Sequence, residues 1–169
     1  MRRASLFVLF LFVMIGMVAG IAPAAAQQVT DTATFNATFN GIARLTFSST
    51  SVSFPDADPD AVPSIPAVQG PITITAKART TLNGAVTLTV QASDDLRSGV
   101  NTIPASSITW TCTGAGFTNG TLSTAAPQLV ANWIASGVRI GTQTFFFKNL
   151  WSYPTGIYTL TMTYTLSGA

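Results

Sequence analysis

Large apolar side chains and threonine alternate without interruption in the stretch Tyr158-Thr159-Leu160-Thr161-Met162-Thr163-Tyr164-Thr165-Leu166. Successive side chains of a β-strand point to opposite faces, so this spacing places all the apolar residues on one face. The stretch predicts a long strand with one buried face and one solvated face.

Shorter runs with the same two-residue period recur along the 169 residues. In the run at residues 30–39, the apolar face consists of Ala33, Phe35, Ala37 and Phe39, and we expect a half-buried strand. Two later runs, at residues 72–78 and 86–92, are separated by Asn83-Gly84. Asn-Gly favours the positive φ angles of a tight turn, so this pair of runs predicts a β-hairpin.

Residues 55–71 contain five prolines and three aspartates, which indicates a long connection rather than an interior strand. Elsewhere, strand-forming runs recur about every ten residues, giving about eight or nine strands. The pattern predicts an all-β fold, an immunoglobulin-like antiparallel β-sandwich, formed as a single domain by residues 27–169.

The N-terminus has the layout of a secretory signal peptide, which we assign to residues 1–26. Arg2 and Arg3 precede an apolar run at residues 6–22, and Ala24-Ala25-Ala26 follows Pro23. We expect cleavage after Ala26 and a secreted or cell-surface protein with no membrane span after cleavage. The alternative is an uncleaved membrane anchor, because the run is close to the shortest length that spans a bilayer.

The composition argues against catalysis and against nucleic-acid binding. The chain contains no His and no Glu, which removes the usual general bases, most zinc sites and the Ser-His-Asp triad. Without Arg2 and Arg3, six basic residues balance six acidic ones, so a neutral chain has no electrostatic reason to bind nucleic acid or an anionic membrane. We therefore expect a non-enzyme that needs no cofactor.

Two features are interpreted as structural. Cys112 is the only cysteine, so no internal disulfide can form, and we expect it to be a small buried residue beside Trp110. Gly156 stands two residues before Tyr158, which is typical of a tyrosine corner, where the tyrosine hydroxyl binds nearby backbone.

Two groups of side chains are candidate ligand sites. Asp56, Asp58 and Asp60 have the spacing that begins a calcium loop, but Ala61 and Ala67 stand where an EF-hand needs Gly and Glu, and we expect ordinary turn chemistry instead of a metal site. The aromatic residues Trp133, Trp151 and Tyr153 could present flat rings to sugars, as in a carbohydrate-binding module. The alternative is that these rings belong to the core.

Several short motifs resemble known families of bacterial surface proteins. Gly156-Ile157-Tyr158 followed by Thr161-Met162-Thr163-Tyr164-Thr165-Leu166 resembles the end of WxL-type cell-surface domains. Ala33-Thr34-Phe35-Asn36 with Val52-Ser53-Phe54 resembles the start of spore-coat-U and chaperone-usher pilin subunits. The resemblance implies an exported immunoglobulin-like surface protein, although the Trp-x-Leu pair and the paired cysteines of those families are missing.

The tetrapeptide Ala33-Thr34-Phe35-Asn36 is repeated as Ala37-Thr38-Phe39-Asn40 directly after the expected cleavage site. A terminal alternating strand of this kind can add to the sheet edge of a neighbouring subunit. The alternative is that it completes its own sandwich. We expect a structural or adhesive surface protein whose partner is itself, another surface protein or a wall polysaccharide. The main alternative function is the carbohydrate-binding module.

Overall fold

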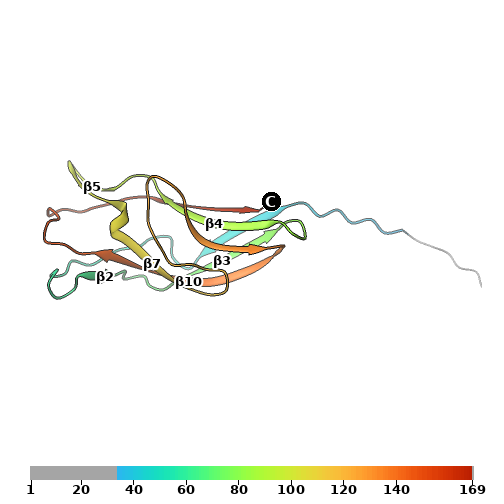
Figure 1. The fold of residues 1–169 in the computed structure, drawn as a ribbon, viewed down its shortest axis with the longest axis horizontal. Coiled ribbons are helices and arrows are strands. Elements are labelled where there is room, and N and C mark those ends of the chain that lie inside the picture. The colour runs from blue at the N-terminus through green and yellow to red at the C-terminus, as the bar shows by residue number, and fades with distance from the viewer. Residues whose placement is uncertain (1–33, 169) are drawn as a thin grey trace, which may run out of the picture. The chain divides into compact units, whose positions relative to one another are not determined.

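The computed structural model describes residues 34–168, and these form a β protein with one short 3-10 turn, η1 (Ala105–Ser107) (Figure 1). The strands are β1 (Ile42–Phe47), β2 (Ser64–Pro66), β3 (Ile72–Arg79), β4 (Ala85–Ala92), β5 (Leu96–Ser98), β6 (Asn101–Ile103), β7 (Ile108–Thr113), β8 (Gly120–Thr121), β9 (Gln128–Ile134), β10 (Gly137–Lys148) and β11 (Met162–Gly168).

These strands form two principal antiparallel sheets. The larger has the order β1-β3-β10-β7-β8, with β2 also paired to β10, and the smaller has the order β11-β4-β9. β5 and β6 form a separate hairpin. The arrangement confirms the predicted all-β antiparallel sandwich and is compatible with an immunoglobulin-like fold.

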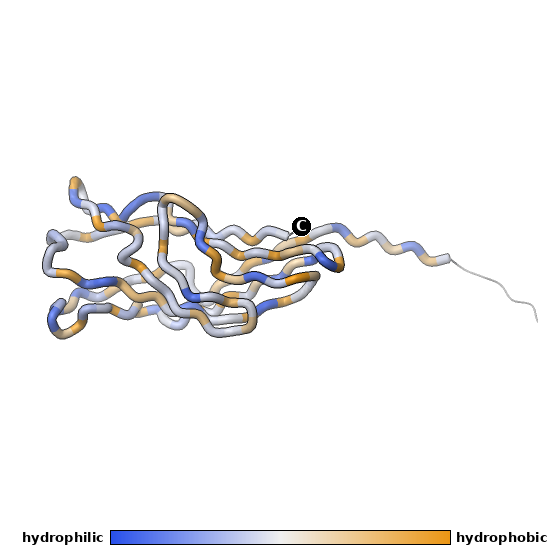
Figure 2. The backbone as a smooth tube through the Cα atoms, in the orientation of Figure 1, coloured by the Kyte–Doolittle hydropathy of each residue, from blue (hydrophilic) through white to orange (hydrophobic). Residues whose placement is uncertain are grey.

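The core lies between the two sheets and follows the two-residue period of the sequence, visible as alternating colours along the strands in Figure 2. β3 contributes Ile72, Ile74, Ala76 and Ala78, and β4 contributes Val86, Leu88, Val90 and Ala92. Trp110 and Phe145 are the largest fully buried side chains, and their ring centroids are 6.3 Å apart. Threonines occupy half of the outward positions on β3 and β4, and all but one of the others are Lys, Arg or Gln, so each sheet keeps a polar face.

The predicted hairpin between residues 72–78 and 86–92 is wrong. β3 belongs to the larger sheet and β4 to the smaller one, so the Asn83-Gly84 connection crosses from sheet to sheet. The turn is closed by the Gly84 amide, which donates to the Thr81 carbonyl at 3.1 Å. Both strands carry an apolar face, and packing the two faces against each other buries more apolar surface than pairing the strands side by side.

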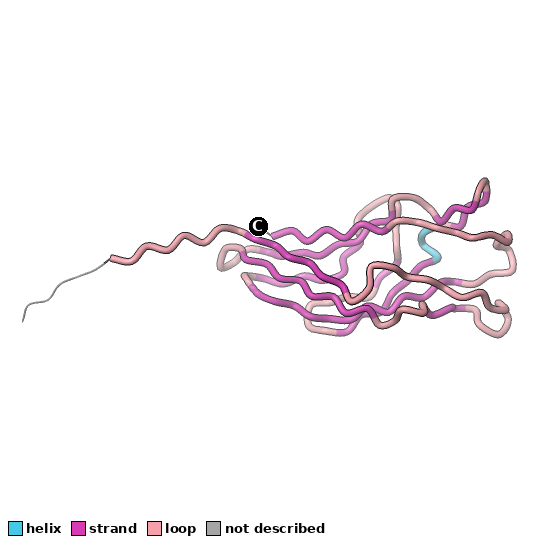
Figure 3. Tube along the Cα trace, turned by 180° about the vertical axis from the view of Figure 1, so that it is seen from behind, coloured by secondary structure: helices cyan, strands magenta, loops and turns pink. Residues whose placement is uncertain are grey.

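Two further differences concern the ends of the described chain. Residues 34–40 form no strand and are exposed, whereas a half-buried strand was expected there. The last strand begins at Met162 instead of Tyr158, because only the later residues pair with β4. Residues 1–33, which include the expected signal peptide and Ala33, lie outside the described residues. Figure 3 shows loops gathered at the end of the sandwich where β10 finishes.

Candidate functional site

An apolar groove of about 1630 Å³ opens between the two sheets. Its floor is formed by core side chains of the larger sheet and the β5–β6 hairpin: Ile65, Ile72, Leu96, Ile103, Ile108 and Phe145. The larger sheet has six strands and the smaller has three. The six floor side chains are nevertheless buried, with 2–6% of each exposed. The apolar surface still open in the groove therefore belongs to its walls, where Phe54, Phe147 and Met162 are only partly buried.

One wall of the groove is β11 and the chain that leads into it. Tyr158, Leu160, Met162 and Tyr164 line it, and all four side chains are partly buried. β11 is the end strand of its sheet, with β4 on one side only. Within the described part of the chain, the other edge of β11 has no strand paired to it, so its backbone donors and acceptors are available to an added strand.

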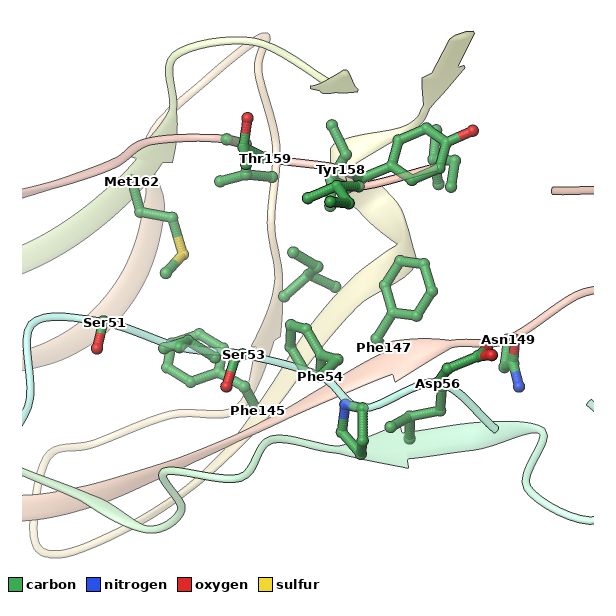
Figure 4. A pocket seen from close by; sticks show the side chains of 18 of the residues that line it. Ser51, Ser53, Phe54, Asp56, Phe145, Phe147, Asn149, Tyr158, Thr159 and Met162 are labelled. Carbon is green, nitrogen blue, oxygen red and sulfur yellow. The ribbon is translucent and has the colours of Figure 1, made fainter. Parts of the chain in front are cut away.

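The opposite wall consists of the end of β1 and the segment at residues 49–59. This segment is fixed by Ser53, whose amide donates to Gln69 Oε1 at 2.7 Å, and by Phe54, whose ring lies 5.6 Å from that of Phe147. Figure 4 shows Phe54, Phe145 and Phe147 on one side of the cavity and Tyr158 and Met162 on the other.

Polar side chains stand at the end of the groove that lies beside the loops. Asp56 and Asp58 line it, and Asn149 holds the same loop by donating from Nδ2 to the carbonyls of Ala57 at 2.9 Å and Val62 at 3.1 Å. The indole of Trp151 donates to Asp60 Oδ1 at 3.0 Å. This end of the groove is therefore acidic and is held in place by side chains from distant parts of the sequence.

The three aromatic candidates for sugar binding occupy different environments. Trp133 is buried, with the Arg139 guanidinium 5.7 Å from its ring. Tyr153 packs against Phe147 and forms a 2.9 Å hydrogen bond with Ser107. Only Trp151 is largely exposed, at 69%. The three rings do not form one platform, although Trp151 and Tyr153 both line the groove.

The aspartates of the calcium-like spacing stay on the surface of their loop. Asp58 Oδ1 accepts the Asp60 amide at 2.9 Å, as in an ordinary Asx turn, and Asp60 accepts the Trp151 indole. Among residues 34–168, no three acidic or cysteine side chains lie close enough together to hold a metal ion.

The described part of the repeated tetrapeptide is exposed. Phe35 is 93% exposed and Phe39 is 74% exposed, and the Arg79 guanidinium lies 5.2 Å from the Phe39 ring. Leaving a phenylalanine ring in water costs about 1.5–3 kcal/mol of free energy relative to burying it. The segment therefore carries apolar surface that another element could cover.

Two side chains of the sandwich, Cys112 and the groove residue Tyr164, have raised pKa values. Burial raises the pKa of the Cys112 thiol to about 11, and this side chain is half-buried, so its expected burial beside Trp110 is only partly confirmed. Burial also raises the pKa of Tyr164 above its ordinary value. The Tyr164 hydroxyl donates to Gln143 Oε1 at 2.7 Å, so the phenol stays neutral and anchors β11 to the larger sheet.

The sequence did not predict that Phe54, Phe147 and Met162 line one groove. Their alternation predicted apolar faces, but nothing local says which apolar faces remain uncovered. The one available signal was the proline-rich connection at residues 55–71, which separates β1 from β3 and forms one wall without a long strand.

Comparison with protein-family models and with curated proteins gives no match. Among the described residues, no helix is long and apolar enough to cross a membrane.

Proposed function

We propose that the protein is an exported, non-catalytic surface subunit that assembles with copies of itself. Each copy donates its N-terminal segment, residues 33–40, as a β-strand to the groove of the next copy. The proposal is carried by one observation: a single chain contains both an apolar groove beside an edge of β11 to which no strand of residues 34–168 is paired, and an exposed segment, residues 34–40, with apolar side chains at every second residue.

The chemistries of the groove and the segment match. An added strand would form backbone hydrogen bonds with β11, while Phe35 and Phe39 would enter the groove among Phe54, Phe147 and Met162. Threonines at the alternate positions, Thr34 and Thr38, would face water like the outward threonines of the sandwich. Burial of the two rings supplies about 3–6 kcal/mol towards association.

The test compares assemblies of the chain beginning at Gln27 with those of a chain lacking residues 27–40, by sedimentation and negative-stain electron microscopy. Phe35→Asp is the point variant, and Thr34→Asp is its matched control on the opposite face. We expect filaments or large oligomers for the parent chain and for Thr34→Asp, and monomers for the deletion and for Phe35→Asp. Equal assembly of all four chains, or monomers throughout, would refute the proposal.

Thermal unfolding distinguishes strand donation from the alternative, in which the segment completes the sandwich of its own chain. If the segment completes its own sandwich, the deletion lowers the melting temperature of the monomer by several degrees. Strand donation predicts an unchanged melting temperature for the monomer.

Carbohydrate binding remains a second candidate because Trp151 is 69% exposed at the acidic end of the groove. Isothermal titration with polysaccharides, comparing the parent chain with Trp151→Ala, tests this function. Heat of binding that disappears in the variant would support it, and no heat in either chain would reject it.

A further inference from the structure

The charged side chains of the described residues are separated between the two ends of the sandwich. Four basic residues, Arg44, Lys77, Arg79 and Arg139, lie at the end where β1 and β10 begin, and we call this the basic end. The strand register places them together: Arg44 pairs with Lys77, Arg79 pairs with Ile42, and Arg139 pairs with Ala76. No described acidic residue belongs to these stretches of strand.

The other end carries all five described aspartates. Asp56, Asp58 and Asp60 stand in the loop at the mouth of the groove, and Asp94 and Asp95 follow the last residue of β4. Of the two basic residues at this end, Arg97 is neutralised by Asp94, with Nε and Oδ2 2.6 Å apart, and Lys148 ends β10. We call the loop with Asp56, Asp58 and Asp60 the acidic mouth.

The two charged ends are too far apart to neutralise each other within one copy. β10 has twelve residues and runs from the basic end to the acidic mouth. At roughly 3.3 Å per residue its ends are roughly 36 Å apart, several times the Debye length of about 8 Å at physiological salt. Without Arg2 and Arg3 the sequence has six basic and six acidic residues, and this balance conceals two oppositely charged surfaces.

The basic end is unfavourable in an isolated copy. Arg44 and Lys77 are directly opposite on neighbouring antiparallel strands, and like charges in that position destabilise a sheet. Within residues 34–168 the only ion pair is Arg97 with Asp94, so the four cations of the basic end have no described carboxylate partner. Arg79 and Arg139 lie instead against the rings of Phe39 and Trp133.

We infer that the groove accepts a second copy in one direction only, with the basic end of the donor docked against the acidic mouth of the acceptor. This inference rests on the proposed strand donation. The donated segment immediately precedes β1 at the basic end, so a segment entering at the acidic mouth brings Arg44, Lys77 and Arg79 to Asp56 and Asp58. Entry from the other end would bring two basic ends together.

The direction also fixes how the donated strand pairs. β11 runs from the acidic mouth towards the basic end, because Met162 pairs with Ala92 and Gly168 with Val86. The donated segment would run from N to C in the opposite direction, so it would be antiparallel to β11. Antiparallel pairing agrees with every strand pair described in the sandwich.

The experiment measures the assembly rate by light scattering from about 50 to about 500 mM salt, a range over which screening becomes strong. The first variant is Lys77→Glu/Arg79→Glu, the second is Asp56→Lys/Asp58→Lys, and the third combines all four changes. Thr111→Glu/Thr113→Glu adds two carboxylates to exposed positions of β7, opposite Thr144 and Thr142 near the middle of β10, and serves as the control. A labelled peptide of residues 27–41 is titrated separately into the chain that lacks residues 27–40.

We expect the parent rate to fall as salt rises, since screening removes the attraction between the two ends. Each single-end reversal slows assembly about tenfold at low salt, the combined variant recovers to within about threefold of the parent, and the control assembles like the parent. The peptide binds in every case, because it lacks the basic end.

If the reversed variants assemble at the parent rate while the peptide still binds, the directional docking is wrong and strand donation stands. Directional docking is equally wrong if the combined variant assembles no faster than either single-end reversal. If the peptide does not bind and the parent does not assemble, both proposals fail.

Discussion

Gln143 is a fully buried amide at the centre of the sandwich. Its Oε1 accepts the Tyr164 hydroxyl, whereas its Nε2 has no hydrogen-bond partner among the described residues. A buried polar group is stabilising only while its bonds are formed, because an unsatisfied donor or acceptor loses its hydration without compensation.

Tyr164→Phe removes the hydroxyl and leaves both polar atoms of Gln143 unpaired, so we expect a loss of about 1–3 kcal/mol in the free energy of unfolding. Gln143→Met in the same chain replaces the amide by an apolar group of similar length. The double variant should therefore be more stable than Tyr164→Phe alone. Urea unfolding of the two single variants and the double variant gives the coupling energy between Tyr164 and Gln143. If the changes in unfolding free energy are simply additive, the two side chains are not coupled and the prediction is wrong.

Cys112 gives a prediction with a defined pH dependence. Its thiol has a pKa of about 11 in the folded protein against the ordinary 9.0, so burial favours the neutral form. The resulting contribution to stability is present below pH 9 and is lost as the pH rises through about 11. At pH 9 we expect iodoacetamide to alkylate the folded protein much more slowly than the urea-unfolded chain, and equal rates would contradict the shift.

Individual side chains could be predicted from the sequence where the reason was local. The tyrosine corner is confirmed, because the Tyr158 hydroxyl donates to the Pro154 carbonyl at 2.9 Å. The burial of the tryptophans was harder to predict, since Trp133 lies on a buried strand face whereas Trp151 lies in an exposed turn. Alternation predicts the face of a strand residue but says nothing about a ring in a loop.

At the scale of elements, the alternating runs correctly located most strands. The pairing of β3 with β4 was wrong because Asn-Gly favours a turn without specifying whether the next strand lies in the same sheet. The short strands β5 and β6 were not predicted, since three-residue strands carry too few residues for a period to be recognised.

The loop that forms the acidic mouth depends on one amide. Asn149→Ala removes the two hydrogen bonds to Ala57 and Val62 and leaves those carbonyls to water, so we expect a loss of about 1–2 kcal/mol in the free energy of unfolding. Amide hydrogen exchange should rise in residues 55–62 with little change in β3 or β4. The neighbouring exposed side chain gives the control, Lys148→Ala, which should change neither quantity.

At the scale of the whole molecule, the sandwich could be predicted and the groove could not. The two-residue period fixes which faces are apolar, and enough apolar faces in short strands imply two packed sheets. The groove depends on the unequal strand numbers of the two sheets and on β11 lying at a sheet edge, which are results of long-range pairing. The same holds for the charge separation, because the residues of the basic end come from three strands far apart in the sequence.

The exposed segment and the groove are explained together if each copy completes its neighbour. A chain that exposes Phe35 and Phe39 and leaves the groove-wall residues Phe54, Phe147 and Met162 only partly buried has not buried all the apolar surface it carries. The proposed strand donation would cover the two exposed rings and the partly buried groove walls together. It also accounts for alternation in a segment that forms no strand of its own.

Photo-crosslinking from the donated segment tests strand donation most directly. The photoreactive amino acid p-benzoylphenylalanine replaces Phe35, with Thr34 as the control position, and isotopically labelled and unlabelled chains are mixed so that mass spectrometry distinguishes links between copies. We predict links from position 35 of one copy to the groove residues Phe54, Phe147 or Met162 of another, and few from position 34. Links confined to a single copy, or links between copies that avoid the groove, would contradict the proposed strand donation.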